Sequence, residues 1–214
     1  MKISRSMIPS LFAAALLSAC GSVEQTVQEA KSYYGAKNYE EALPLLREAA
    51  EAGDADCQLM LARCYDFSQG VPQNMTEAAK WYRAAADQGN SDAQDNLGTC
   101  YFNGQGVPRD EAQAAYWYKK AAEQNNPYAL NNLGLCYRNG QGVVKDDVAA
   151  MNCFLRAAQL NNRAAQYNLG RCYFHGLGTP KDEQAARFWI SKAAEAGHAD
   201  ARAFMQDHHW GAVL

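Results

Sequence analysis

Four cysteines recur along the chain at one spacing, and a row of thiols is the first feature that could do chemistry. Each is followed by tyrosine, and consecutive members are 36 residues apart: Cys64, Cys100, Cys136 and Cys172. Thiolates ligate metals and undergo redox exchange, so a metal array or a redox ladder is one hypothesis. A fixed period of this length is typical of stacked repeats, however, in which equivalent positions lie roughly 10 Å apart. A disulfide needs Cα atoms within about 7 Å, so we interpret these thiols as small buried packing groups.

Two further cysteines, Cys57 and Cys153, fall outside this register. Cys57 comes two helical turns before Cys64 on the same predicted helix, which excludes a disulfide between those two. The sequence leaves open whether Cys57 and Cys153 are free or paired.

The sequence contains no motif of nucleophilic or metal-assisted catalysis. No serine has lysine three positions later, and there is no His-Glu-x-x-His, Walker loop or Gly-x-Ser-x-Gly. The four histidines are too scattered to specify a metal site, although His208 and His209 offer two ligands for adventitious metal; the alternative is a solvated terminal helix. We therefore expect no catalytic residues, no resident metal and no small-molecule cofactor, and we predict that the protein is not an enzyme.

The elements that would position a site can be read from one period, residues 91–126. Apolar residues at the spacing of one helical face predict a first helix over residues 91–103. Glycines and a proline at residues 104–108 end it, because glycine accepts positive φ and proline cannot continue a helix. A second helix is predicted after Asp110, whose carboxylate can cap the first turn, and it ends near Asn125.

The same order of helix, glycine loop and helix returns along the chain. The predicted N-caps of the second helices are equivalent residues: Asn74, Asp110, Asp146 and Asp182. Recurrent alanine pairs let neighbouring helices approach closely, and large residues fill the grooves beside them. One helix pair cannot bury both of its faces alone, so the pattern predicts an all-α stack of antiparallel helix pairs.

The pattern A-x-x-x-L-G-x-C-Y-x-x-G-x-G-V-x-x-D, followed by A-x-x-W-Y-x-x-A-A, closely resembles the Sel1-like repeat, a relative of the tetratricopeptide repeat (TPR) with a longer inter-helix loop. The resemblance covers about residues 39–210. It implies a right-handed α/α superhelical solenoid that acts as an adaptor or scaffold for proteins or peptides. A cysteine-rich branch of the family has one disulfide within each repeat, but this chain has alanine at the second cysteine position, so we do not expect that pairing.

The repeats divide the chain into five predicted parts. A signal peptide occupies residues 1–19, and a lipidated tether occupies residues 20–28. A short TPR-like helix pair without the long glycine loop follows at residues 29–53. Four Sel1-like repeats span residues 54–198, and a C-terminal capping helix with polar substitutions occupies residues 199–214.

The best candidate binding surface is the concave face, which the first helix of each pair lines in a right-handed stack. In the TPR family, the residue before the Leu-Gly pair is often asparagine and bonds the backbone of a ligand. The candidate ligand-binding residues are therefore Asn96, Asn132 and Asn168, with Arg63, Arg138, Arg171 and Tyr167 beside them. Amides can satisfy both the N–H and the C=O groups of an extended peptide. The alternative is that these asparagines bond local backbone and hold the repeats together.

The first twenty residues have the pattern of an export signal. Lys2 and Arg5 precede an apolar run that is too short to span a bilayer comfortably, and small residues follow it. The string Leu-Ser-Ala-Cys at residues 17–20 resembles the lipobox of bacterial lipoproteins. This resemblance implies that Cys20 is lipidated and anchors the protein, since each buried methylene contributes about 0.8 kcal/mol. Plain cleavage of a signal peptide is the alternative.

Composition and charge narrow the class of partner. The chain is 48% hydrophobic and 20% charged, with a formal net charge of −3, and it lacks the clustered basic face of a nucleic-acid binder. We expect a lipoprotein of the cell envelope, at the outer membrane facing the periplasm or exposed at the surface, that binds a protein or peptide partner. The alternatives are a secreted effector that contacts a host protein, and an accessory of an envelope enzyme, β-lactamase-like or related to the cell wall.

Overall fold

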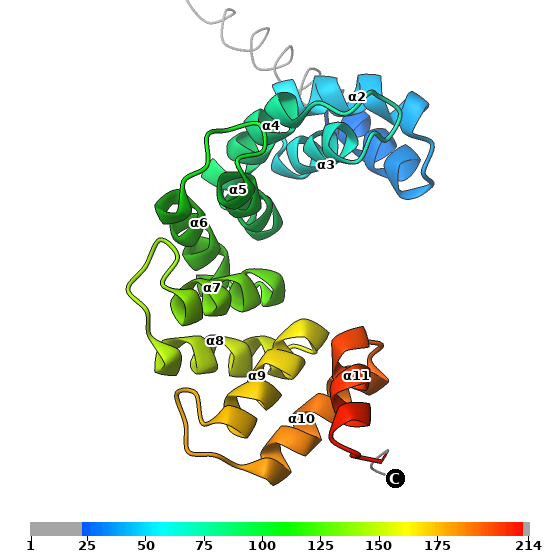
Figure 1. The fold of residues 1–214 in the computed structure, drawn as a ribbon. Coiled ribbons are helices and arrows are strands. Elements are labelled where there is room, and N and C mark those ends of the chain that lie inside the picture. The colour runs from blue at the N-terminus through cyan, green and yellow to red at the C-terminus, as the bar shows by residue number, and fades with distance from the viewer. Residues whose placement is uncertain (1–22, 212–214) are drawn as a thin grey trace, which may run out of the picture. The chain divides into compact units, whose positions relative to one another are not determined.

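The computed structural model describes residues 23–211, which form helices and no strands (Figure 1). The predicted signal peptide at residues 1–19 and the predicted lipidation site Cys20 lie outside the described residues. Contacts divide the chain into two compact units, Met1–Asn90 and Ser91–Leu214. Antiparallel helix pairs stack within each unit, so the predicted all-α fold class is confirmed.

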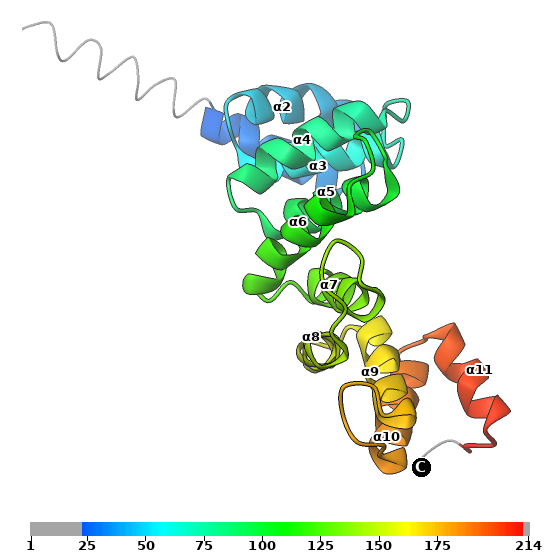
Figure 2. The ribbon, with the colours of Figure 1, turned by 60° about the vertical axis from the view of Figure 1, so that its left-hand side comes forward.

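The first unit contains a helical segment over residues 23–35 and three further helices: α2 (Tyr39–Glu51), α3 (Ala55–Asp66) and α4 (Met75–Asp87). These helices lie side by side in both views (Figures 1 and 2). Residues 23–28, which the sequence predicts to be tether, already belong to the first helix, and Val27 is buried against α2 residues such as Leu46. Apolar side chains at helical spacing give this segment a core-facing side.

The second unit contains seven helices within its described residues. They are α5 (Ser91–Asn103), α6 (Glu111–Glu123), α7 (Pro127–Asn139), α8 (Asp147–Gln159), α9 (Arg163–His175), α10 (Glu183–Glu195) and α11 (Ala199–Asp207). We call α3, α5, α7, α9 and α11 the A helices, and α4, α6, α8 and α10 the B helices. Within this unit α5, α7 and α9 each pack against the B helix that follows, and α7, α9 and α11 each pack against the B helix before; α11 has no B helix after it in the described chain.

The predicted N-caps start the B helices. The Asp110 carboxylate accepts a hydrogen bond from the Gln113 N–H at 3.0 Å, and Asp146 accepts from the N–H groups of Val148 and Ala149, each at 2.9 Å. Each bond satisfies a backbone donor that the first turn of a helix leaves without a partner. Asn74 and Asp182 cap α4 and α10 in the same way, so the predicted helix starts are confirmed.

In two of the long loops a glycine sets the spacing between repeats. Gly142 has φ +69°, and a Cβ atom there would collide with the backbone carbonyl of Glu111 at the start of α6. A Cβ atom at Gly178 would likewise collide with the backbone carbonyl of Asp147 at the start of α8. The loop of one repeat therefore lies directly on the B helix of the repeat before it, and a side chain would push the two apart.

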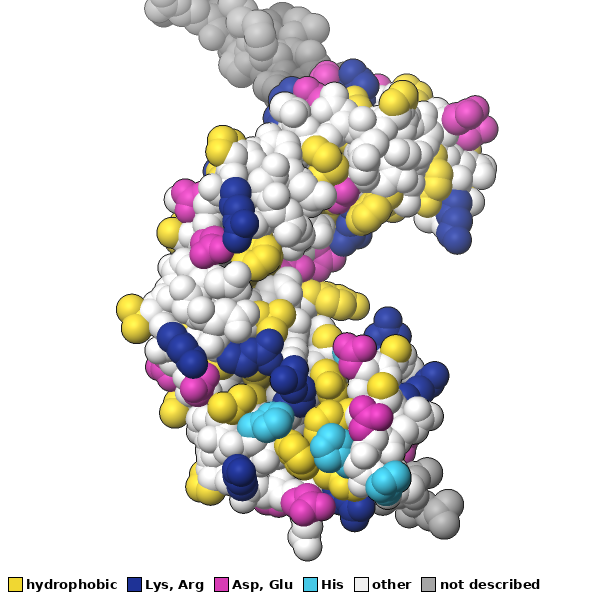
Figure 3. Space-filling model, viewed as in Figure 1, with side chains coloured by type: hydrophobic (Ala, Val, Ile, Leu, Met, Phe, Trp, Pro, Cys, Tyr) yellow, Lys and Arg dark blue, Asp and Glu magenta, His cyan; other side chains and the backbone are white. Residues whose placement is uncertain are grey.

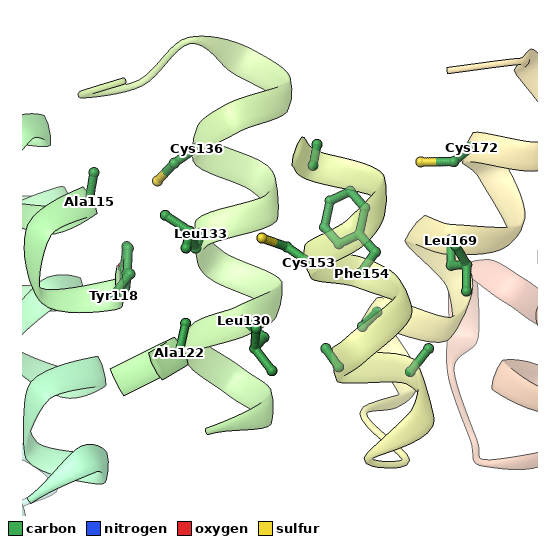
Figure 4. Packing of buried hydrophobic residues seen from close by; sticks show 14 of the residues in the cluster. Ala115, Tyr118, Ala122, Leu130, Leu133, Cys136, Cys153, Phe154, Leu169 and Cys172 are labelled. Carbon is green, nitrogen blue, oxygen red and sulfur yellow. The ribbon is translucent and has the colours of Figure 1, made fainter. Parts of the chain in front are cut away.

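The glycine of the Leu-Gly pair lets the two helices of one repeat approach closely. A Cβ atom at Gly134 of α7 would come within 2.6 Å of the Phe154 ring of α8, and one at Gly98 of α5 within 2.7 Å of the Tyr118 ring of α6. Figure 4 shows Phe154 and Leu133 inside the same hydrophobic cluster. The bulky B-helix side chain thus fills the space that the missing side chain leaves.

The repeated cysteines are packing residues. Cys57, Cys64, Cys100, Cys136, Cys153 and Cys172 are all free and buried. Burial raises the pKa of Cys136 and of Cys172 to about 11, so both stay protonated thiols at neutral pH. In Figure 4, Cys136 points toward α6 and Cys172 toward α8, each into a different layer of the stack. The sequence-based interpretation of these thiols is confirmed, and the open question about Cys57 and Cys153 is answered.

Candidate functional site

The A helices of the second unit are linked to one another by side-chain contacts between residues 37 positions apart. The Asn132 Nδ2 atom of α7 donates to Asp95 Oδ1 of α5 at 2.9 Å. The Asn168 Nδ2 atom of α9 donates to Asn131 Oδ1 of α7, also at 2.9 Å. The next equivalent pair is aromatic, with ring centroids of Tyr167 and Phe204 6.2 Å apart. The surface that carries these contacts, on α5, α7, α9 and α11, is called the A-helix face below.

The three predicted asparagines occupy this face but differ in accessibility. Asn168 is buried at 8% exposure, and its amide bonds both Asn131 and Arg138. Asn132 is half-buried and bonds Asp95. Asn96 is also half-buried, and its side chain makes no hydrogen bond to another described residue. The bonds of Asn132 and Asn168 favour the hypothesis that they hold repeats together, whereas Asn96 keeps its amide available.

The structure brings Arg138, Arg171 and Tyr167 together around Asn168. Arg138 Nη1 donates to Asn168 Oδ1 at 3.2 Å, and its guanidinium lies 5.7 Å from the Phe154 ring centroid. The Arg171 guanidinium lies 5.8 Å from the centroid of Tyr167. Burial, followed by the positive charge of Arg171, lowers the pKa of Arg138 below its usual value. The two guanidinium groups are therefore neighbours on the A-helix face.

The remaining predicted residue, Arg63, belongs to the first unit. It lies on α3 and is half-buried. Burial raises the pKa of Tyr34 to about 12, and the positive charge of Arg63 acts in the opposite direction on that hydroxyl. Arg63 thus faces the helix of residues 23–35, and nothing places it with the second-unit candidates.

A hollow of about 580 Å³ opens on the A-helix face of the second unit. It extends along three A helices, with Asp95 from α5, Asn131 and Asn132 from α7, and Arg163 from the start of α9. The exposed Tyr128 ring also lines it. Asp95, Tyr128, Asn131 and Arg163 were not among the sequence-predicted site residues. Asp95 directly precedes Asn96, and Asn131 directly precedes Asn132. The position before each candidate asparagine is also on the outward side of the helix, so the sequence could have indicated both residues.

The hollow has an acidic end and a basic end. Burial raises the pKa of Asp95 to about 6, an effect that the hydrogen bond from Asn132 opposes and the nearby Asp92 carboxylate reinforces. Arg163 lies two repeats further along the chain and is exposed. Amide groups of Asn131 and Asn132 occupy the space between. An extended chain with polar backbone groups could satisfy these amides along the length of the hollow.

A smaller pocket of about 200 Å³ lies beside this hollow. It is lined by Thr99, Phe102, Tyr118, Asn132, Leu135 and Cys136. Its walls are mainly apolar, and the Tyr118 and Thr99 hydroxyls bond each other at 3.1 Å. Pockets for drug-sized molecules are usually about 300 Å³ or larger, so this pocket matches a single side chain better.

One glutamine near the hollow lacks a partner that its equivalents have. The Gln88 amide donates to Gln58 Oε1 at 2.8 Å, and the Gln124 amide donates to Gln94 Oε1 at 2.9 Å. The equivalent of Gln88 next to Gln166 is Ala196, and the Gln166 Oε1 atom is buried without a hydrogen bond from a described residue. The site therefore has one unsatisfied buried acceptor close to the Ala196 wall of the hollow.

The histidines take part in ring packing. His198 stacks on Tyr167 with centroids 4.9 Å apart, and His208 stacks on Phe204 at 4.0 Å. The His208 Nδ1 atom also lies 2.9 Å from the Phe204 carbonyl oxygen. Histidine side chains lie over the C-terminal end of α9 and over α11, beside lysine or arginine side chains (Figure 3). Within residues 23–211, no three histidine, cysteine, aspartate or glutamate side chains form a group that could hold a metal ion.

No helix within the described residues is long and apolar enough to cross a membrane.

Comparison with known proteins finds one family and several related structures. The sequence model of the Sel1 repeat matches residues 31–54, 55–90, 91–126, 127–162 and 163–198. The fold resembles that of a protective antigen present in uropathogenic Escherichia coli strains, which displays an SLR fold. The identity is 30% and the TM-score 0.79, over 92% of this chain and 44% of that one. This chain thus spans less than half the length of that relative.

Two further structures extend the comparison. A Sel1 repeat protein from Oxalobacter formigenes is 33% identical with a TM-score of 0.75, over 84% of this chain and 74% of that one. A Sel1 repeat protein from Klebsiella pneumoniae shares the fold at 22% identity and a TM-score of 0.57, over 89% and 95% of the two chains. No curated protein matches the chain by sequence.

Proposed function

This chain belongs to the Sel1 repeat family, and from that premise we propose that it is an exported lipoprotein of the cell envelope that binds a protein or peptide through its A-helix face. Sel1 repeat proteins are generally scaffolds for protein interactions, and the family is typically non-enzymatic. The proposal adds the compartment, the lipid anchor and the surface that does the binding.

The observation that carries the proposal is the hollow on the A-helix face. It extends along three repeats and presents amides between a carboxylate and a guanidinium. Neighbouring A helices lie about 10 Å apart, so a hollow along three of them is roughly 20 Å long. An extended chain advances about 3.3 Å per residue, which corresponds to about six residues of peptide. A repeated helix surface of this kind provides specificity through side chains and requires no bond chemistry.

The lipid anchor rests on the N-terminal sequence. The Leu-Ser-Ala-Cys string places Cys20 at the lipidation position, and the predicted consequence is a chain tethered to the outer membrane, facing the periplasm or the surface. Metabolic labelling with a clickable fatty acid tests this: the wild type becomes labelled, and Cys20→Ala does not. Equal labelling of both proteins would contradict lipidation at Cys20.

A second candidate function is contact with a host protein by a surface-exposed or secreted form. One relative is described as a protective antigen of uropathogenic Escherichia coli, and that description favours exposure of that protein to a host. The binding physics would be the same and only the partner would differ. Protease treatment of intact cells tests the surface-exposed form, because a chain that faces the periplasm is protected, and the presence of the chain in the culture medium tests the secreted form.

Chemical crosslinking and affinity capture from the native envelope test the binding face. Arg163→Glu reverses a charge in the hollow, and Lys119→Glu makes the same change on the exposed side of α6. We expect the wild type and Lys119→Glu to recover the same partner and Arg163→Glu to lose it, with unchanged circular dichroism in all three. Equal recovery by Arg163→Glu and the wild type would contradict binding in the hollow.

A further inference from the structure

Two arginines beside the hollow are held next to each other without a carboxylate between them. Arg138 Nη1 bonds Asn168 Oδ1, and Arg171 comes one helical turn after Asn168 on α9. Their positive charges act on each other, which lowers the pKa of Arg138 in addition to the effect of burial. Neither arginine forms an ion pair with an acidic side chain among the described residues. Two neighbouring positive charges repel each other, so a negative group placed near both would be attracted.

Aromatic rings hold both guanidinium groups, and the Asn168 amide holds that of Arg138 as well. Arg138 lies over the Phe154 ring, and Arg171 lies over the Tyr167 ring. A guanidinium that stacks on a ring keeps its N–H edge available for hydrogen bonds. The pair is therefore ordered before any ligand arrives, so binding costs less side-chain entropy.

The surroundings add further positive charge. Lys181 supplies this charge: burial lowers the pKa of His175, and the charges of Arg171 and Lys181 lower it further, so both cations lie near that ring, which itself stays uncharged at neutral pH. Asp147 partly offsets this charge at Arg138. Figure 3 shows lysine or arginine side chains beside histidines and hydrophobic side chains over this part of the second unit. A carboxylate placed between the two arginines would accept charge-assisted hydrogen bonds from both.

The small apolar pocket begins one helical turn from the arginine pair. Leu135 lines that pocket, and Arg138 follows it by three residues on α7. Residues at this spacing lie on one side of a helix with Cβ atoms about 5–6 Å apart. The pocket lies between α5 and α7 and the arginine pair between α7 and α9, so the two are roughly 10 Å apart, one repeat. Alternate residues of an extended peptide point to the same side and lie about 6.6 Å apart, and the lengths of their side chains cover the remaining distance.

We propose that Arg138 and Arg171, together with the pocket lined by Phe102, Tyr118 and Leu135, recognise an acidic side chain and an apolar side chain two residues apart in an extended partner segment. The acidic side chain lies between the guanidinium groups, and the apolar side chain fills the pocket. This inference rests on the proposed function and specifies the chemistry of the partner.

Short synthetic peptides test this recognition directly. The probes are seven-residue serine peptides, blocked at both ends, that carry leucine at position 3 and glutamate at position 5, or the reverse order. Matched probes replace glutamate by glutamine, replace leucine by serine, or place the two side chains four residues apart. A final probe has leucine and no glutamate but a free C-terminal carboxylate. Binding to the purified mature chain is measured by NMR titration up to millimolar peptide.

We expect one of the two leucine–glutamate orders to bind at least tenfold more tightly than its glutamine, serine and wider-spaced counterparts. Arg171→Gln removes the preference for glutamate over glutamine, and Leu135→Gln removes the preference for leucine over serine. The matched control is Arg187→Gln on α10, whose guanidinium also stacks on a ring, 5.1 Å from the Trp210 centroid, but lies outside this site. It keeps both preferences.

Three results would overturn the inference: no binding at millimolar peptide, equal binding of glutamate and glutamine peptides, or a glutamate preference that survives in Arg171→Gln. Binding only of the peptide with a free C-terminal carboxylate would overturn the assignment to a side chain. A photo-crosslinker at position 128 in living cells separates this failure from that of the proposed function. A crosslinked partner without the peptide preference leaves the scaffold function intact, whereas absence of both contradicts both.

Discussion

Within the second unit, the side of the A helices that faces the B helices carries recurrent residues, whereas their outward side varies from one helix to the next. Toward the B helices, α7 and α9 carry the same series of leucine, glycine and cysteine: Leu133, Gly134 and Cys136 match Leu169, Gly170 and Cys172. On the A-helix face the same two helices differ at nearly every position, with Asn131 against Tyr167 and Leu135 against Arg171. Packing requires the same shape at each step, whereas a binding surface gains specificity from differences between steps.

We expect the largest loss of stability from a substitution at a loop glycine, where two repeats pack so closely that a side chain does not fit. Gly142→Ala forces a side chain into the Glu111 carbonyl and also strains a backbone with positive φ. We expect a loss of several kcal/mol of stability, or about 10 °C in Tm, measured by thermal denaturation. Gly197→Ala is the control, because its φ is +86° but its nearest neighbours are 3.7 Å away, so it reports strain without collision. Equal losses would contradict the role of Gly142 in repeat spacing.

A second change tests whether the asparagines of the A-helix face are structural. Asn168→Ala removes an amide that bonds Asn131 and Arg138, so two polar groups lose a partner. The expected cost is about 1–3 kcal/mol in urea denaturation. Asn96→Ala, at the equivalent position of α5, should change stability by less than about 0.5 kcal/mol. Similar small effects for both would show that the Asn168 bonds add little.

Replacing the Asp95 carboxylate should change the stability of the protein by an amount that depends on pH. Its pKa is raised to about 6 in the folded chain, so the folded state binds a proton more readily than the unfolded state, and this group favours folding less as pH rises. Asp95→Asn removes the buried charge and keeps an oxygen that can accept from Asn132. We expect Asp95→Asn to be more stable than the wild type by about 1–2 kcal/mol at pH 7–8, with the difference declining as pH falls through 6 toward 4. A difference independent of pH, from Tm measured at each pH, would contradict the shifted pKa.

The smallest effect should come from restoring a missing bond. Ala196→Gln places a donor next to the buried Gln166 Oε1 atom, as Gln88 and Gln124 do in equivalent pairs. The expected gain is about 1 kcal/mol or less in urea denaturation. Ala196→Met, of similar length but without a donor, should not give it. If both variants are stabilised equally, the gain in stability comes from apolar burial rather than from the hydrogen bond.

The repeated part of the structure could be predicted from the sequence, because a position that recurs every 36 residues reveals its role several times. Asp110 and Asp146 were identified as caps, and the loop glycines as helix ends, and the structure confirms both. The packing of Gly142 on Glu111 was not predictable, because it depends on how closely two repeats approach. Residues 23–28 lie before the first recognisable repeat, so no recurrent position shows that they pack as part of a helix.

The site was predicted only in part, because several of its positions differ between repeats. The register of the repeats identifies Asn168, Arg138 and Arg171, which lie near one another, and also Asn132, which bonds Asp95 of α5 instead. Asp95 was missed because its equivalent in the next repeat is Asn131, so no recurrent residue type marks the position. The neighbouring positions of the two arginines depend on long side chains that reach across a repeat, and spacing in the sequence does not specify where such side chains end.

The central claim, that the partner binds on the A-helix face, is tested most directly by photo-crosslinking at two tyrosines. Tyr128 is 65% exposed and lines the hollow, whereas Tyr116 is 49% exposed on the B helix α6. Benzoylphenylalanine replaces each tyrosine in turn in the full-length chain, and living cells are irradiated. The account predicts a crosslinked partner from position 128 and none from position 116. A partner crosslinked from position 116 alone would contradict it.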